Sequence, residues 1–241
     1  MITIYTCSYF GVTFRYTVRC MERTVTVLKL EDVTHDTKRL VLERPPGYHY
    51  EAGQAAEIAI DKPEWREETR PFSFTSIEED DHLEFIVKIY VANEGVTRQI
   101  AELTPGDHIR LSEPFGTIRY RGAGYFIAGG TGITPFLSIL RRLYRDGELA
   151  GNKLLFSNRT ERDIILKSEL DRMLRENVVY NVTHQSSSTF RSGLISPQYL
   201  SRHAPDLSRL FYICGPDEMV RDVRDMLIAL GADSNALVFE E

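Results

Sequence analysis

The sequence contains little cysteine: only Cys7, Cys20 and Cys214 occur among its 241 residues. These residues lie far apart, so they cannot supply the clustered thiolates of a plant-type iron–sulfur centre or of a zinc site. We therefore expect a protein without a built-in cluster or metal site, with reduced thiols and a cytoplasmic location.

The sequence also lacks long apolar runs and an excess of positive charge. No run approaches the roughly 18 apolar residues that a membrane span needs. A content of 42% hydrophobic and 27% charged residues is typical of a soluble globular protein, and a net charge of −6 argues against a nucleic-acid binder. We expect neither a membrane nor a nucleic acid as a partner.

The N-terminal residues 1–20 are weakly patterned. They carry no charge before Arg15 and contain no clean apolar core, which argues against a signal peptide. Alternate residues from Val12 to Val18 are apolar, a pattern that suits an additional strand. We interpret residues 1–20 as an N-terminal extension without catalytic consequence.

Glycine is concentrated in one stretch, Gly129-Gly130-Thr131-Gly132. An apolar run of strand length precedes it, and Thr134-Pro135 follows, which we interpret as the N-cap and the first residue of a helix. A glycine loop between strand and helix offers free N–H groups and a positive helix end to an anionic or electron-rich ligand. The same pattern also suits tight packing alone.

The two halves of the chain differ in the order of their predicted secondary-structure elements. Short strands separated by Pro- and Gly-rich turns fill the first half, which predicts a six-stranded antiparallel β-barrel over residues 21–118. Strands and helices alternate in the second half, which predicts an α/β doubly wound parallel sheet over residues 119–241. The barrel strands are predicted at 24–30, 39–43, 55–60, 70–76, 83–89 and 108–112, with one helix at 97–103. The parallel strands are predicted at 125–128, 153–157, 178–183 and 210–214, and the helices at 134–146, 162–176 and 217–230.

Carboxylates at two predicted helix starts suggest caps rather than catalysts. Thr160 and Asp163 have the spacing of a capping box, with Asp in place of Glu, and Asp217 and Glu218 lie in the first turn of the last helix.

Several motifs occur in a defined order along the chain. Arg70-Pro-Phe-Ser73 is followed by Gly95-Val96-Thr97, Glu113-Pro-Phe-Gly116, the glycine loop and finally Cys214-Gly215-Pro216. In order and spacing they resemble the ferredoxin–NADP reductase superfamily of flavin-dependent reductases, over about residues 22–241. The resemblance implies an FAD-binding barrel followed by an NAD(P)-binding domain.

The resemblance implies roles for the barrel motif. Arg70 would pair with the flavin pyrophosphate, Phe72 would stack near the isoalloxazine, and Ser73 would hydrogen-bond the ring near N5. The family usually has Tyr at the position of Phe72, so stacking is retained while any phenol hydrogen bond is lost. The alternative is a surface arginine and a core phenylalanine.

Two further barrel segments resemble flavin-binding segments of the family. The helix start at Gly95, Val96 and Thr97 would hold the diphosphate. The strand containing Val87 and Lys88 would lie along the flavin through its backbone, with Lys88 as the polar contact. Lys88 could equally be an ordinary exposed strand lysine.

The nicotinamide side is predicted at the carboxyl edge of the parallel sheet. Thr131, between Gly130 and Gly132, touches both rings in relatives, and Cys214 would lie beside it. Cys214 is not assigned as a nucleophile, because hydride transfer belongs to the cofactors, and it could instead be a small buried hydrophobe. The predicted catalytic residues are Ser73, Thr131 and Cys214, with Gly130, Gly132, Gly215 and Pro216 as cofactor-binding neighbours.

The adenosine side is predicted at Ser157 and Arg159, after the second parallel strand. A ribose 2′-phosphate would favour the cation of Arg159, whereas Glu161 and Asp163 would favour a 2′-hydroxyl. Near the C-terminus, Phe239 could shield the flavin face or complete the core of a fifth strand.

We expect a monomeric flavin-dependent oxidoreductase that passes a hydride from NAD(P)H to FAD. Electrons would then go to a separate redox carrier protein such as ferredoxin or flavodoxin. NADP(H) is the expected nucleotide, with NAD(H) possible. The alternatives are the reductase component of an oxygenase, a free-flavin or haem-protein reductase, and a non-catalytic flavin-binding interaction module.

Overall fold

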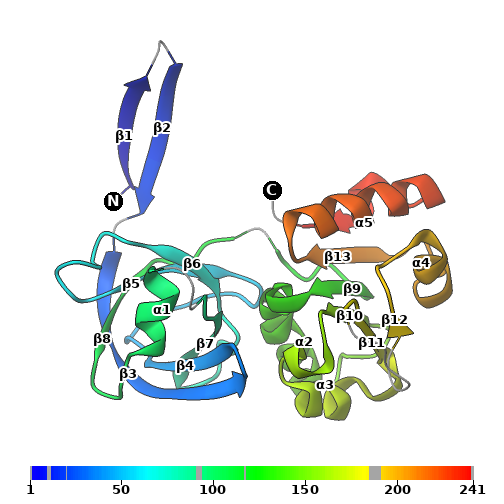
Figure 1. Ribbon diagram of the computed structural model, residues 1–241, viewed down its shortest axis with the longest axis horizontal. Helices are drawn as coiled ribbons and strands as arrows, with labels where there is room; N and C mark the ends of the chain where they lie inside the picture. Colours follow the sequence, from blue (N-terminus) through cyan, green and yellow to red (C-terminus); the bar gives the residue numbers. More distant parts are fainter. Residues whose placement is uncertain are drawn as a thin grey trace.

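Figure 1 shows the computed structural model, in which an antiparallel β unit lies beside an α/β unit and a hairpin projects from the β unit. The structure describes residues 2–9, 12–19, 21–90, 94–116, 118–184 and 191–239, with side chains from residue 23 onward except those of 191 and 192. Predictions on Cys20 and on the side chain of Cys7 lie outside this part. The hairpin consists of β1 (Ile2–Tyr9) and β2 (Val12–Arg19), which form a sheet of their own. The alternation from Val12 to Val18 thus lies on a strand.

The β unit is the predicted six-stranded antiparallel barrel. Its strand order is β6-β5-β8-β3-β4-β7, and an isolated bridge between Phe74 and Phe85 links the two edges. The first strand is longer than predicted because its first part pairs with β8 and its second part with β4. The strands are β3 (Met21–Thr34), β4 (Thr37–Glu43), β5 (Ala55–Ile60), β6 (Arg70–Ser73), β7 (His82–Lys88) and β8 (His108–Ser112). The helix of this unit, α1 (Val96–Ala101), buries Ile100 in the barrel core, as predicted.

The α/β unit contains the predicted parallel sheet, with strand order β12-β11-β10-β9-β13-β14. The strands are β9 (Gly124–Gly129), β10 (Lys153–Asn158), β11 (Val178–Val182), β12 (Arg191–Ser192), β13 (Leu210–Cys214) and β14 (Leu237–Val238), and the helices are α2 (Thr134–Asp146), α3 (Lys167–Leu174), α4 (Pro197–His203) and α5 (Asp217–Leu230).

Side-chain alternation along β9 creates two cores, one on each face of this sheet. Phe126 and Ala128 pack with residues of α2 and α3, whereas Tyr125 and Ile127 pack with residues of α4 and α5. Figure 1 accordingly shows α2 and α3 on one side of the sheet and α5 on the other. None of the helices in the described part of the chain has the length and apolar character that crossing a membrane requires.

The predicted helix at 162–176 is wrong as a single element. The chain forms a 3-10 turn at Glu161–Asp163, then α3, then a second 3-10 turn at Arg175–Asn177. Leu166 and Arg175 interrupt the helix because both have positive φ, at 51° and 52°. The capping box of Thr160 and Asp163 is confirmed, although it caps the first 3-10 turn instead of a helix.

The predicted N-cap at Thr134 is also wrong. A 3-10 turn at Gly130–Ile133 runs directly into α2, so that Ile133 occupies the N-cap position. The Thr134 hydroxyl donates to the Thr131 carbonyl at 3.0 Å. The glycine loop is therefore itself the first turn of a continuous helical segment.

The two units share an apolar contact along α2. Ala52, Ile86 and Ile118 from the barrel side belong to the same buried cluster as Ile139 of α2. The Gly53 amide donates to the Ser138 hydroxyl at 3.0 Å. The glycine loop lies next to β7, so strand and loop are held together across the contact.

Candidate active site

The glycine loop and the Cys214-Gly215 segment meet at the carboxyl edge of the parallel sheet. β9 and β13 are neighbours, with Ala128 opposite Cys214. A β-carbon on Gly132 would lie 2.2 Å from the Cys214 carbonyl oxygen and 2.5 Å from the Gly215 nitrogen. Main chain therefore packs on main chain here, and the glycine loop that contains Thr131 adjoins the end of β13 at Cys214.

Gly129 makes a second close contact at the same edge of the sheet, with Pro216 and Met219. A β-carbon on Gly129 would lie 2.5 Å from Met219 Sδ and 3.0 Å from Pro216 Cδ. Gly130, by contrast, has φ +53°, and no atom of the described residues lies within 4 Å of its β-carbon position. Its backbone is thus open to a flat ligand, while Gly129 is packed against Met219 of α5.

The start of α2 fits an anion better than the start of α5. The first turn of α5 contains Asp217 and Glu218, as predicted, so its positive end is already complemented. The first turn of α2 contains no acidic residue. No acidic side chain therefore complements the positive end of the helical segment that begins with the glycine loop.

The predicted adenosine side lies at the end of β10. Ser157 is buried, and its hydroxyl accepts a hydrogen bond from Asn181 Nδ2 at 3.3 Å. Arg159 is exposed, and its guanidinium has no partner within the described residues. In the capping box, Asp163 Oδ2 accepts hydrogen bonds from the Thr160 amide at 2.7 Å and from the Thr160 hydroxyl at 2.5 Å. Asp163 is therefore less available than Arg159 to a ribose substituent.

Asn158, at this edge, was not among the predicted site residues. The residue is only 4% exposed, and neither amide atom of its side chain has a hydrogen-bond partner in the described part of the chain. Buried amides are almost always satisfied, so this one is a candidate contact for a bound nucleotide. The signal was a polar residue at the carboxyl end of a strand with an apolar centre, Leu154 to Phe156.

The barrel motif lies on β6. Arg70 is exposed, and its guanidinium donates to the Thr69 carbonyl at 2.6 Å and lies 3.5 Å from Glu68 Oε2. Phe72 packs partly against the barrel core, and Ser73 is half-buried. The partners of Arg70 in the described part of the chain thus lie at the surface, where a ligand could replace them.

The remaining barrel residues lie on β7 and α1. Val87 is fully buried, so only its backbone can face a ligand. Lys88 is ion-paired, with Nζ 2.7 Å from Asp36 Oδ2, and this ammonium would have to leave Asp36 to contact a flavin. Gly95, the N-cap of α1, has an extended backbone, and no atom of the described residues lies within 4 Å of its β-carbon position. Val96 is buried, and Thr97 Oγ1 accepts from the Tyr90 amide at 3.5 Å.

Phe239 follows β14 and is partly buried against the core beneath α5. This placement agrees with its interpretation as a final core residue.

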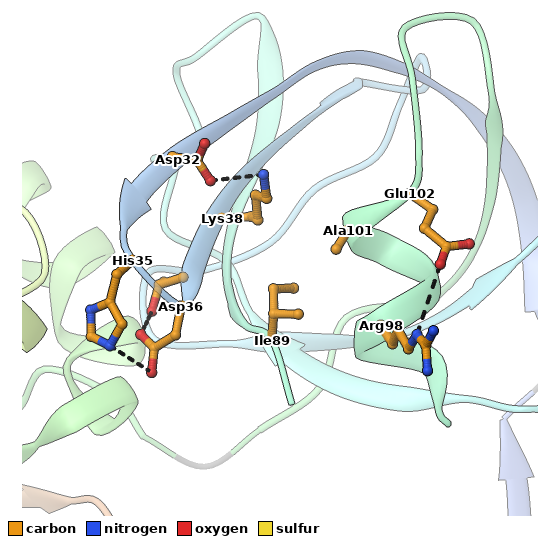
Figure 2. Close-up of a pocket in the computed structure, with 9 residues that line it drawn as sticks. Asp32, His35, Asp36, Lys38, Ile89, Arg98, Ala101 and Glu102 are labelled. Atoms are coloured by element: carbon orange, nitrogen blue, oxygen red, sulfur yellow. Dashed lines mark hydrogen bonds and ion pairs between the residues drawn. The ribbon is translucent and has the colours of Figure 1, made fainter. Parts of the chain in front are cut away.

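Figure 2 shows a different cavity, of about 310 Å³, between the β3–β4 turn and α1. Four of its charged side chains form two ion pairs, Lys38 with Asp32 at 2.7 Å and Arg98 with Glu102 at 3.9 Å. None of the predicted site residues lines it. We do not regard this cavity as part of the active site.

Two family models match the chain. An oxidoreductase FAD-binding domain covers residues 24–120, and an oxidoreductase NAD-binding domain covers residues 126–225. Among solved structures, the flavohem-like FAD/NAD-binding domain of nitric oxide dioxygenase from Vibrio cholerae has a TM-score of 0.81 at 20% identity, over 90% of this chain and 97% of that one. This likeness is one of fold.

Three relatives show similarity in sequence. The plasma membrane-associated coenzyme Q6 reductase of Saccharomyces cerevisiae is 33% identical over 219 residues, 80% of this chain and 68% of that protein. NADH-cytochrome b5 reductase 1 of Debaryomyces hansenii is 31% identical, over 66% of this chain and 61% of that protein. The ferredoxin–NAD(P)(+) reductase component of the naphthalene 1,2-dioxygenase/salicylate 5-hydroxylase systems of Ralstonia sp is 30% identical, over 86% and 64%. The chain thus spans less than two thirds of the last two relatives. With both domain models and the predicted fold present in one chain, the protein belongs to the ferredoxin–NADP reductase superfamily of FAD-dependent oxidoreductases.

Proposed function

We propose that this protein is an NAD(P)H-dependent flavoprotein reductase that delivers electrons to a separate redox carrier. The observation that supports this most strongly is the junction of the glycine loop with Cys214-Gly215, next to β7 of the barrel. That junction is where a flavin on the barrel and a nicotinamide on the parallel sheet would meet.

Features of the chain fit the two cofactors. The positive end of α2, the open backbone at Gly130 and the unpartnered Asn158 amide suit a pyridine nucleotide along the sheet edge. The open space at Gly95 and the surface guanidinium of Arg70 suit the diphosphate of FAD.

When bound, FAD and NAD(P)H would supply the hydride and electron chemistry. The protein's part is to bind and orient. Arg70 and the start of α1 would hold the diphosphate, Phe72 would pack against the flavin, and Ser73 would offer its hydroxyl near N5. Thr131 and Cys214 would limit how the nicotinamide lies, because their loops are fixed by backbone packing.

The electron acceptor could be a ferredoxin, a flavodoxin or an oxygenase component. A haem protein is a second candidate, because relatives include a protein named as an NADH-cytochrome b5 reductase as well as a dioxygenase reductase component. We place NADPH ahead of NADH because the guanidinium of Arg159 is unpaired and Asp163 is engaged in a cap.

The test begins with the flavin. The purified protein should be yellow, and the flavin released on denaturation should be FAD rather than FMN. Reduction should then be followed with NADPH and NADH, using ferredoxin, flavodoxin, cytochrome b5 and added free flavin as acceptors. Turnover of free flavin alone would indicate a flavin reductase. A colourless protein that takes up no flavin in titration would refute the proposal, and flavin binding without reduction would favour an interaction module.

A further inference from the structure

Arg141 of α2 joins three elements from both units. Its side chain is 17% exposed, and Nη1 lies 2.6 Å from Glu84 Oε1 on β7. The same Nη1 donates to the Thr75 carbonyl at 2.7 Å. Nε and Nη2 donate to the two carboxylate oxygens of Glu169 on α3, at 2.6 and 3.0 Å. We call Arg141, Glu84, Glu169 and Thr75 the Arg141 cluster.

Glu84 is bound within this cluster from several sides. Its side chain is 8% exposed, and it accepts from the Thr75 hydroxyl at 2.7 Å and lies 3.3 Å from Arg39 Nε. Burial favours the neutral acid, but the charge and hydrogen bond of Arg141 outweigh it, so the pKa of Glu84 lies below its ordinary value. The pKa of Arg141 is raised despite burial, through Glu169 and Glu84. The cluster is therefore a charged network with several directed bonds.

The cluster connects the parts of the chain that would hold the two rings. Arg141 lies nine residues after Gly132 on one continuous helical segment, about 13 Å of helix rise from the glycine loop. Glu84 lies three residues before Val87 on β7, and Thr75 lies two residues after Ser73. The Arg141 guanidinium thus links α2, which continues from the glycine loop, to both barrel segments predicted to contact the flavin.

We infer that Arg141 is a positioning residue for hydride transfer: with Glu84 and Glu169 it fixes the angle between the barrel and the nucleotide-binding sheet. This inference rests on the proposed function. Apolar packing of Ile86 and Ile118 against α2, together with the Gly53 to Ser138 hydrogen bond, holds the units together without the cluster. Loss of Arg141 should therefore change the angle rather than separate the units. A ring displacement of about 1 Å can slow such a reaction roughly a hundredfold.

The chain offers a matched control one turn further along α2. Arg145 also reaches the barrel side, where it pairs with Glu79 in the turn before β7. This pair is exposed, at 39% and 52%, and exposed ion pairs contribute little to stability or geometry. Arg145→Ala therefore removes a cationic side chain and an ion pair between the units without touching the buried network.

The experiment compares wild type, Arg141→Met, Arg141→Lys, Glu84→Gln and Arg145→Ala as flavin-loaded proteins. Flavin affinity, nucleotide affinity, the stopped-flow rate of flavin reduction at saturating NAD(P)H and the long-wavelength charge-transfer absorbance are measured on each. We expect Arg141→Met to reduce its flavin ten- to a hundredfold more slowly and to show weaker charge-transfer absorbance, with both affinities within about threefold of wild type. Arg145→Ala should match wild type in all four.

Hydrogen–deuterium exchange gives a readout that does not require turnover. Residues 129–133 should exchange faster in Arg141→Met than in wild type and be unchanged in Arg145→Ala. If Arg141→Met does not fold, Arg141→Lys and Glu84→Gln decide the question. Lysine keeps the charge but cannot donate to both carboxylates in a planar fork, so we expect a rate at least fivefold below wild type.

Wild-type rates and absorbance in the folded Arg141 and Glu84 variants would overturn the inference. Equal losses in Arg145→Ala would also overturn it, because any loss of charge on α2 would then suffice. If wild type itself binds no flavin or is not reduced by NAD(P)H, it is the proposed function that fails.

Discussion

The α-carbon of Gly132 lies against the main chain of Cys214, so that a β-carbon there would be 2.2 Å from the Cys214 carbonyl oxygen. The next nearest atoms are also main chain, the Cys214 carbonyl carbon and the Gly215 nitrogen. Backbone atoms cannot rotate away as a flexible side chain can. The contact therefore fixes the end of β13 relative to the loop that leads into α2.

Gly132→Ala should separate these two loops. We expect the free energy of unfolding to fall by about 1–3 kcal/mol, as for other overpacked sites, and flavin reduction by NAD(P)H to slow at least tenfold. Denaturant unfolding and stopped-flow absorbance measure the two effects.

The control is Gly147→Ala at the other end of α2. Gly147 is the left-handed C-cap, with φ 73°, and alanine there costs about 1–2 kcal/mol of stability without altering the site. Its reduction rate should stay near wild type. A similar rate loss in both variants would mean that stability, and not loop geometry, controls the reaction.

Thr131→Val and Cys214→Ala test the nicotinamide side directly. Thr131 lies in the glycine loop and Cys214 at the adjoining end of β13, whereas the flavin contacts are predicted on the barrel. We expect flavin reduction to slow at least tenfold in each variant, with the flavin dissociation constant within about twofold of wild type. Reduction rates equal to wild type in both variants would remove these residues from the site.

Arg70→Ala tests the flavin side. Among the described residues, Arg70 contacts the Thr69 carbonyl and Glu68 at the surface, so its removal should leave stability nearly unchanged. A lost charge-assisted bond of about 1.5–3 kcal/mol should weaken FAD binding tenfold or more. Fluorescence titration of the flavin-free protein measures this. Arg66→Ala, which removes a surface ion pair with Asp61 in the same unit, is the control and should bind FAD normally.

Elements with strong local signals could be predicted from the sequence. The helices α2 and α5 have the predicted bounds, because each combines apolar residues at helical spacing with a left-handed glycine, Gly147 or Gly231, at its end. The order of strand, glycine loop and helix around Gly129 could likewise be predicted from the local sequence. The meeting of the glycine loop with Cys214 followed from the topology of parallel sheets.

Features that depend on distant residues could not be predicted in this way. Glu84 and Arg141 are 57 positions apart, and the pairing of Lys88 with Asp36 follows from how β4 and β7 align. The breaks at Leu166 and Arg175 come from backbone conformations that a helical pattern does not reveal. Charge pairs and turns of this kind are fixed by tertiary packing, and a single sequence carries little trace of them.

The acid stability of the protein should depend on Glu84. Burial opposes its ionisation, but Arg141 and the Thr75 hydroxyl lower the pKa of Glu84 in the folded protein. A carboxyl whose pKa is lower folded than unfolded stabilises the protein above the unfolded pKa, and this stabilisation is lost as the pH falls through the folded pKa. Wild type should therefore lose stability below about pH 4.3, the ordinary glutamate value. Glu84→Gln has no charge to titrate and should show a flatter profile between pH 5 and 3. If the melting temperatures of wild type and Glu84→Gln fall by the same amount between pH 5 and 3, the prediction is wrong.

We expect Arg159 to contribute to a preference for NADPH over NADH. Its guanidinium is exposed and unpaired within the described residues, and it follows Asn158, whose buried amide is also unsatisfied. The nearby carboxylate of Asp163 is engaged by Thr160, so it opposes a 2′-phosphate less than the sequence alone suggested. We expect wild type to favour NADPH over NADH modestly. Arg159→Ala should lower kcat/KM for NADPH about tenfold, the equivalent of one charge-assisted bond of roughly 1.4 kcal/mol, and change that for NADH less than about twofold.

Arg162→Ala provides the comparison, since Arg162 is an exposed arginine three residues further along. It should leave kcat/KM for both nucleotides unchanged, because Arg162 lies within the 3-10 turn at Glu161–Asp163, beyond the end of β10 at Asn158. Steady-state kinetics with each nucleotide over a range of ionic strengths would separate a directed phosphate contact from general electrostatic attraction, which salt screens over about 10 Å at 0.1 M. If Arg159→Ala and Arg162→Ala lose NADPH activity equally, or if wild type favours NADH, Arg159 is an ordinary surface arginine and nucleotide choice depends on other residues at this edge.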